Sequence, residues 1–214
     1  EEYEKYHNDY YKAFCDRADD PGNWFDNYNL FIEWLTISST KMSINHVFLT
    51  SKIQLTGRSE LDSDYSTYIP QDLSRTESAI EIFANSTGIF RNCYFKNAER
   101  VAVITRDFST VKFYNCLFED NQISVFLMNE SYAEFIDCKF KSDRNISIFC
   151  TKNSHAKIIN CHFYNLKGKA IFAKDESIVS IKDTKFEKCN KGAATIAEKS
   201  KIYLDGGVEI IGSN

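Results

Sequence analysis

Apolar and polar residues recur along this chain with a period of 22 or 23 positions. An Asn or Asp precedes a Cys or Thr, and a Phe follows two positions later, in Asn92-Cys93-Tyr94-Phe95, Asn115-Cys116-Leu117-Phe118, Asp137-Cys138-Lys139-Phe140, Asn160-Cys161-His162-Phe163 and Asp183-Thr184-Lys185-Phe186. A Ser stands seven positions before each Cys or Thr, at Ser86, Ser109, Ser131, Ser154 and Ser177. Self-similarity at a fixed period predicts a solenoid built from stacked coils.

Each repeat contains short stretches in which apolar and polar residues alternate, such as Val111-Lys112-Phe113. Alternation with a period of two is typical of β-strands, and the spacing leaves room for three strands in each coil. The Asn or Asp lies where the alternation breaks, and the Ser marks a second bend. The period is too short for helical-hairpin repeats, and the regular Leu positions of leucine-rich repeats are absent. The pattern therefore predicts an all-β solenoid.

The stacked Asn-Cys-x-Phe and Ser positions resemble the right-handed parallel β-helix repeats of the pectate-lyase-like superfamily. In particular they are similar to the non-catalytic repeats of some F-box and Shc-binding proteins. The resemblance covers about residues 78–211, with a looser coil at 31–51, and it implies a right-handed parallel β-helix. It says little about function, because this fold carries many activities.

The chain divides into three stretches of a single predicted domain. Residues 1–30 alternate aromatic and charged side chains and predict an N-terminal α-helical cap. Residues 31–77 predict the first irregular coils with a protruding loop, and residues 78–214 predict the regular coils. No capping pattern occurs near the C-terminal end, so we expect end-to-end or assembly contacts there.

Composition narrows the functional classes. The net charge of −4 argues against nucleic-acid binding, although residues 137–201 carry 7 acidic and 14 basic side chains. No apolar run reaches the roughly 18 residues of a transmembrane helix. Seven cysteines cannot all pair with one another, and four of them occupy the repeat as small apolar residues. We therefore weakly favour an intracellular protein, and secretion remains open.

The repeats contain few residues in patterns typical of catalysis or metal binding. Polysaccharide-cleaving members of the superfamily need clustered carboxylates, and adjacent Asp residues occur only at Asp19-Asp20. Cysteines stacked in a line about 5 Å apart do not converge as a zinc site requires. We therefore predict no catalytic residue, no metal site and no cofactor. We also expect no surface groove that holds three carboxylates with a Lys, Arg or His within reach of a common point.

One outward column of the predicted strands is unusually aromatic. Strict alternation turns the column of Phe126, Phe149 and Phe172 outward, beside small residues at Ala102, Ser124, Ser147 and Ala170. The candidate partner-docking residues are Phe83, Ile104, Phe126, Met128, Phe149 and Phe172. Two interpretations stay open: the chain's own N-terminal segment or loop covers this stripe, or a protein partner docks on it. We expect a non-enzymatic rigid scaffold or protein-binding module, and the alternative is a carbohydrate-binding or polysaccharide-cleaving β-helix.

Overall fold

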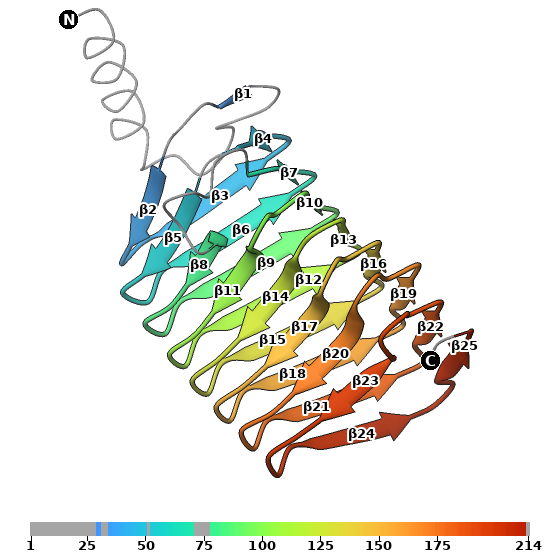
Figure 1. Cartoon of the computed structure of the whole chain (residues 1–214). Coiled ribbons are helices and arrows are strands. Elements are labelled where there is room, and N and C mark those ends of the chain that lie inside the picture. The colour runs from blue at the N-terminus through green and yellow to red at the C-terminus, as the bar shows by residue number, and fades with distance from the viewer. Residues whose placement is uncertain (1–28, 31–33, 51, 71–77, 213–214) are drawn as a thin grey trace, which may run out of the picture.

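The structure, a computed structural model, describes residues 29–30, 34–50, 52–70 and 78–212. These residues wind as a right-handed parallel β-helix of about seven turns, and each turn adds one strand to each of three sheets (Figure 1). The predicted all-β solenoid with three strands per coil is confirmed. Residues 1–28 of the predicted helical cap lie outside the described residues, and Asn29–Leu30 form strand β1.

The three sheets are named A, B and C here. Sheet A contains β1 (Asn29–Leu30), β4 (Phe48–Leu49), β7 (Thr67–Tyr68), β10 (Tyr94–Lys96), β13 (Leu117–Glu119), β16 (Lys139–Lys141), β19 (His162–Tyr164), β22 (Lys185–Glu187) and β25 (Glu209–Ile211). Sheet B contains β2 (Trp34–Ser38), β5 (Lys52–Thr56), β8 (Ser78–Ile82), β11 (Val101–Thr105), β14 (Ile123–Leu127), β17 (Ile146–Cys150), β20 (Lys169–Ala173) and β23 (Ala194–Ile196). Sheet C contains β3 (Lys41–Asn45), β6 (Glu60–Asp64), β9 (Thr87–Arg91), β12 (Thr110–Tyr114), β15 (Tyr132–Ile136), β18 (His155–Ile159), β21 (Ile178–Lys182) and β24 (Lys201–Asp205).

The Asn or Asp of each repeat forms the corner between sheets C and A. These residues have φ between 47° and 57°, at Asn92, Asn115, Asp137, Asn160 and Asp183. Asn and Asp adopt this left-handed conformation more readily than most residues, because their short side chains bond locally. The side chains also bond from coil to coil, as in the 2.8 Å hydrogen bond that Asn115 Nδ2 donates to Asn92 Oδ1. The predicted bend at this position is confirmed.

Aromatic rings fill the interior of the coil stack. The Phe that follows each Cys or Thr forms the inner Phe ladder, whose members are buried and stack at centroid distances of 4.4–4.9 Å: Phe95, Phe118, Phe140, Phe163 and Phe186. A second set of buried rings from sheet C meets this ladder at steep angles, at Phe90, Phe113 and Phe135. The inner Phe ladder predicted from the sequence is confirmed.

The Cys and Ser columns satisfy backbone groups inside the coil. The Cys116 thiol donates to the Phe90 carbonyl of the preceding coil over 3.4 Å. Ser109 Oγ accepts the Ser86 backbone N–H at 3.1 Å, which links two successive coils at the corner between sheets B and C. All six cysteines in the described part of the chain are buried: Cys93, Cys116, Cys138, Cys150, Cys161 and Cys189.

Sheet B departs from strict alternation, and this corrects the sequence prediction. The small residues expected beside the outward Phe column are buried: Ala102, Ser124, Ser147 and Ala170. Ser124 and the next residue, Val125, are both buried, so burial in this strand does not follow the alternation expected of a sheet with one solvated face. The Ser124 hydroxyl also donates a hydrogen bond to buried Asp143 Oδ2 at 2.6 Å.

Candidate partner-binding face

Three phenylalanines stand in register on the outer surface of sheet B and form what we call the outer Phe ladder: Phe126, Phe149 and Phe172. Their side chains are half-buried, while the residues on either side of each Phe are buried. The rings of Phe126 and Phe149 stack at 4.7 Å with planes 4° apart, and those of Phe149 and Phe172 at 5.2 Å and 15°. This spacing follows from the parallel strand separation, so the sheet itself holds the rings rigidly.

The mutual stacking determines what the outer Phe ladder offers to a partner. Each ring covers the face of its neighbour, so mainly ring edges turn toward solvent. At one end the Lys169 ammonium lies 4.7 Å from the Phe172 ring centroid, a cation–π contact. Ile123 and Ile146 lie half-buried on the same strands as Phe126 and Phe149. The result is a flat, preorganised apolar strip with a basic end.

The face changes character toward the N-terminal coils. Ile104 occupies the same column as the outer Phe ladder, yet it is only 4% exposed. Glu81, the next residue of the column, is also buried, and it pairs with the buried Lys52 ammonium at 3.2 Å. Ile104 is therefore not an accessible docking residue, which corrects the sequence prediction. The accessible part of the column runs from β14 to β20.

The remaining predicted residues lie at the edge of the face. Phe83 and Met128 are half-buried, and the Arg106 guanidinium lies 4.5 Å from the Phe83 ring centroid. Sequence reasoning missed Phe108, which is 61% exposed at the nearby corner between sheets B and C with φ of 61°. A bulky residue in the left-handed region is a conformational outlier. No repeat signal pointed to Phe108, because other coils carry polar residues at that position.

A buried polar group lies behind the face, at the corner between sheets A and B. The Asn121 backbone N–H donates to Asp143 Oδ1 at 3.1 Å, and Asn121 Nδ2 donates to the Phe95 carbonyl at 3.1 Å. Burial raises the pKa of Asp143 to about 6, and the hydrogen bonds from Ser124 and Asn121 only partly offset this effect. These hydrogen bonds connect three successive coils at the corner next to the strands that carry the outer Phe ladder.

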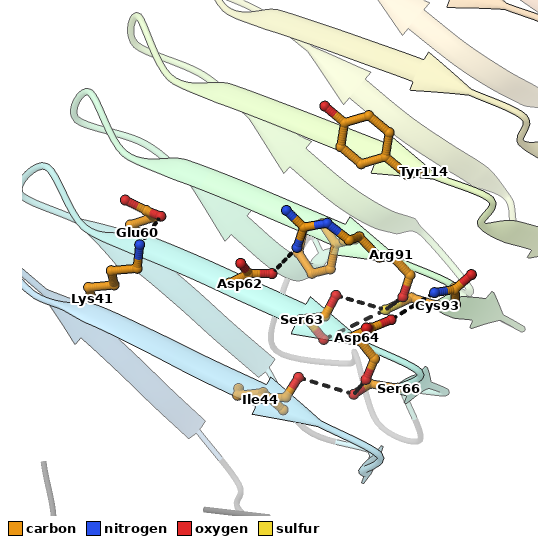
Figure 2. Close-up of polar contacts among 12 residues, drawn as sticks. Lys41, Ile44, Glu60, Asp62, Ser63, Asp64, Ser66, Arg91, Cys93 and Tyr114 are labelled. Carbon is orange, nitrogen blue, oxygen red and sulfur yellow. Dashed lines mark hydrogen bonds and ion pairs between the residues drawn. The ribbon is translucent and has the colours of Figure 1, made fainter. Parts of the chain in front are cut away.

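The other outer surfaces are charged and paired within the chain. On sheet C, Lys41 pairs with Glu60 at 2.7 Å, Arg91 pairs with Asp62, and the Arg91 guanidinium lies over the Tyr114 ring (Figure 2). On sheet A, Lys141 Nζ donates to Glu119 at 2.6 Å and lowers the pKa of that carboxyl to about 2. Neither surface presents an aromatic strip comparable to the outer Phe ladder among the residues described.

An open hollow of about 590 Å³ lies at the corner between sheets B and C, and the expectation that no groove brings three carboxylates and a basic group to a common point stays a prediction. Three carboxylates and two lysines line it, with one asparagine: Asp175, Glu176, Glu198, Lys152, Lys199 and Asn153. A hydrogen bond with Glu198 and another from Thr151 lower the pKa of Asp175 to about 2. The same contact with Asp175 raises the pKa of Glu198. The repeat concealed this grouping, because its members come from three successive coils.

The described part of the chain shows few features of a metal site or of a nucleophilic cysteine. No group of three or more His, Cys, Asp or Glu residues there is arranged to hold a metal ion. Burial raises the pKa of the Cys150 thiol to about 12, which disfavours the reactive thiolate. The described residues also include no helix that is long and apolar enough to cross a membrane.

Comparison with known proteins agrees with the fold. Residues 53–209 match a family model described as a right handed beta helix region. A search of curated proteins finds no match. The match spans the outer Phe ladder and the hollow, and its description concerns architecture alone.

Proposed function

We propose that this chain, which belongs to the right-handed β-helix family, acts as a non-enzymatic rigid scaffold that binds a protein partner through the outer Phe ladder. The observation that carries the proposal is the stack of half-exposed rings at Phe126, Phe149 and Phe172 on a flat parallel sheet. An apolar strip of this kind on the outside of a soluble fold is typical of an interaction surface.

The stacking favours a protein over a sugar as the occupant. Sugars bind aromatic side chains through the flat ring face, and the faces within the outer Phe ladder are covered by neighbouring rings. Aliphatic and aromatic side chains of a protein pack well against ring edges. Each ring fully buried contributes up to about 1.5–3 kcal/mol, less the cost of ordering the partner. Because the strands already hold the rings, the scaffold's share of that cost is small.

We expect Phe149→Asp to abolish partner capture from native extract while the fold stays intact. The new carboxylate would lie at the centre of the apolar strip, where a partner would have to desolvate it. Loss of the two ring stacks costs about 1–3 kcal/mol, which lowers the melting temperature by about 2–12 °C in a chain of this size. Affinity capture followed by mass spectrometry, together with thermal unfolding, measures both effects.

The matched control is Ile159→Asp, which changes a half-buried outward residue on sheet C in the same way. Proteins lost with Phe149→Asp and retained with Ile159→Asp are partners of the outer Phe ladder. If Phe149→Asp unfolds the domain, the ladder is core in character and the docking proposal fails. If the wild type, Phe149→Asp and Ile159→Asp capture the same proteins equally, the docking proposal fails as well.

A second candidate function is supported by the hollow at the corner between sheets B and C. Its carboxylates at Asp175 and Glu198 have pKa values shifted in opposite directions, a pattern that acid–base pairs in glycoside chemistry use. Two observations weigh against this candidate: Lys174 already pairs with Asp175 at 3.4 Å, and Lys199 pairs with Glu176 at 3.5 Å.

We therefore expect no turnover of acidic polysaccharides above background. The assay follows reducing ends and unsaturated products from polygalacturonate and related polymers, with and without Ca²⁺. The Asp175→Asn/Glu198→Gln double variant serves as the matched blank. Product formation by the wild type that the double variant lacks would replace the scaffold proposal with an enzymatic one.

A further inference from the structure

Basic side chains gather on one flank of the outer Phe ladder, at the corner between sheets A and B. Successive coils contribute four cations there: Arg144, Lys167, Lys169 and Lys191. The same corner of these coils and of the coil before them carries two carboxylates, Asp120 and the buried Asp143. Asp120 Oδ1 lies 3.4 Å from the Lys167 ammonium and 3.9 Å from Arg144 Nε, so two cations share one accessible carboxylate. This flank therefore carries an excess of positive charge.

Charges on the opposite flank, at the corner between sheets B and C, are largely paired within the chain. Ion pairs of 3.0–3.5 Å join three sets of side chains there: Arg106 with Asp107, Lys174 with Asp175, and Lys199 with Glu176. A partner that lies on the outer Phe ladder therefore meets unbalanced positive charge on one side only. Opposite charge on the partner is favoured on that side, and like charge there is disfavoured.

The spacing of the rings matches the pitch of an α-helix better than the repeat of a β-strand. The rings of the outer Phe ladder follow one another at 4.7 and 5.2 Å. Side chains one turn apart on a helix are separated by about 5.4 Å along its axis, so a helix parallel to the rod drifts by about 1 Å over the three rings. Side chains on one face of an extended strand repeat at about 6.6–6.8 Å and drift by about 3 Å.

The basic flank repeats with the same spacing as the rings. The Arg144 N–H donates to the Asn121 carbonyl at 2.8 Å, and the Lys167 N–H donates to the Asp143 carbonyl at 3.0 Å. Arg144 and Lys167 therefore occupy equivalent positions in successive coils, one strand separation apart. Carboxylates at positions i and i+4 of a helix also lie about one turn apart on one side of it. A single helix can thus present apolar side chains to the rings and carboxylates to the cations.

We infer that the partner of the outer Phe ladder is an amphipathic α-helix that lies along the rod, with an apolar stripe on the rings and Asp or Glu side chains on the flank that faces Lys167 and Lys169. The inference rests on the proposed function, because it names the partner of the same face. Amphipathic helices commonly dock through one apolar side chain per turn. The one-sided charge also fixes the direction of the helix, because a reversed helix would turn its carboxylates toward the corner between sheets B and C.

Three synthetic peptides of about 18 residues, or five helical turns, test the inference. The first has Leu along one stripe and Glu beside it, the second has Lys in place of every Glu, and the third is the acidic peptide with two central prolines. Fluorescence anisotropy measures their binding to the full chain. We expect the acidic helix to bind at least about tenfold more tightly than the basic one, and the proline peptide to lose most of the binding. The net charge of −4 would by itself favour the basic peptide, so preference for the acidic one reports the local flank.

Charge reversal on the flank identifies the residues responsible. Lys167→Glu/Lys169→Glu is expected to bind the acidic helix at least about tenfold more weakly, and Lys167→Gln/Lys169→Gln to show a smaller loss. The matched control is Lys139→Glu/Lys182→Glu, which makes the same change of charge at exposed lysines on sheets A and C and is expected to bind as the wild type does. Melting temperatures report whether each variant is folded.

Failure of this inference is distinguishable from failure of the proposed function. Absence of binding by the acidic helix, equal binding of the acidic and basic helices, or equal losses in the flank and control variants would overturn the inference. A wild-type dimer that Phe149→Asp dissociates would also overturn it, because a second copy would then occupy the face. The proposed function survives these results as long as Phe149→Asp removes proteins captured from native extract, and it fails if that capture is unchanged.

Discussion

Phe140→Ala is expected to lower the free energy of unfolding by about 3–5 kcal/mol, the largest stability loss foreseen here for a single side chain. Phe140 is fully buried, and its ring stacks on Phe118 at 4.7 Å and on Phe163 at 4.4 Å. Phe135 approaches it from sheet C at 5.7 Å and 64°. Truncation removes these three ring contacts and leaves a cavity that the rigid coil cannot collapse to fill.

Chemical denaturation of the wild type and Phe140→Ala measures this loss. Phe140→Leu is the useful control, because it keeps much of the volume and should lose markedly less. A cost below about 1 kcal/mol for Phe140→Ala would mean that the inner Phe ladder is not the central packing element. The account of the fold would then need a different core register.

Asp143→Asn is expected to stabilise the protein by about 2–3 kcal/mol at neutral pH. The pKa of Asp143 is raised from 3.8 to about 6 by burial, so the folded state holds the proton more tightly than the unfolded state. With a raised folded pKa for an acid, stability falls as the pH rises from about 4 to about 6, and the penalty persists above that range. Asparagine removes the buried charge and keeps an oxygen for the Asn121 N–H.

The geometry for this replacement already exists one coil earlier. Asn121 occupies the equivalent buried position, accepts the Ala98 N–H at 2.9 Å, and donates to the Phe95 carbonyl. Unfolding free energies from pH 4 to 8 should decline for the wild type and stay flatter for Asp143→Asn. Asp137→Asn, which changes an exposed carboxylate, should leave the decline in place. A destabilised Asp143→Asn at pH 7 would contradict the assignment of a costly buried charge.

Periodicity predicted the parts of the fold that every coil repeats. The inner Phe ladder, the Asn or Asp corner and the Ser bend recur because each coil must satisfy the same packing and backbone demands. Within the irregular coils predicted for residues 31–77, one carries the repeat motif in altered form: Ser59 takes the Ser position and Tyr68 the Phe position, where Tyr68 stacks on Phe95 at 4.9 Å. With Ser66 in place of Cys, the composite motif was too altered to recognise.

Features that belong to single coils were not predictable from the repeat. Ser124 donates a hydrogen bond to Asp143, a residue from the following coil whose burial no local pattern reveals. The burial of Ile104 was not predictable either, because alternation indicates only which way a side chain points. The hollow around Asp175 and Glu198 forms where polar corner residues of neighbouring coils meet.

The position of the outer Phe ladder, from Phe126 to Phe172, was predicted from the sequence, whereas its limits were found only in the structure. Alternation in the sequence predicted which residues form this column. The burial of Ile104 and Glu81 shows where the accessible part of the column begins. The expectation that it binds a protein rather than a sugar rests on the stacking of its rings, which the structure reveals and the sequence does not.

Site-specific photo-crosslinking tests the central claim most directly. A benzophenone side chain replaces Phe149 in one protein and Ile159 in another, and both are irradiated in native extract. The account predicts that the partner captured by the wild type crosslinks at position 149 on sheet B and not at position 159 on sheet C. Crosslinking of that partner at position 159 alone would contradict the claim that the outer Phe ladder is the docking face.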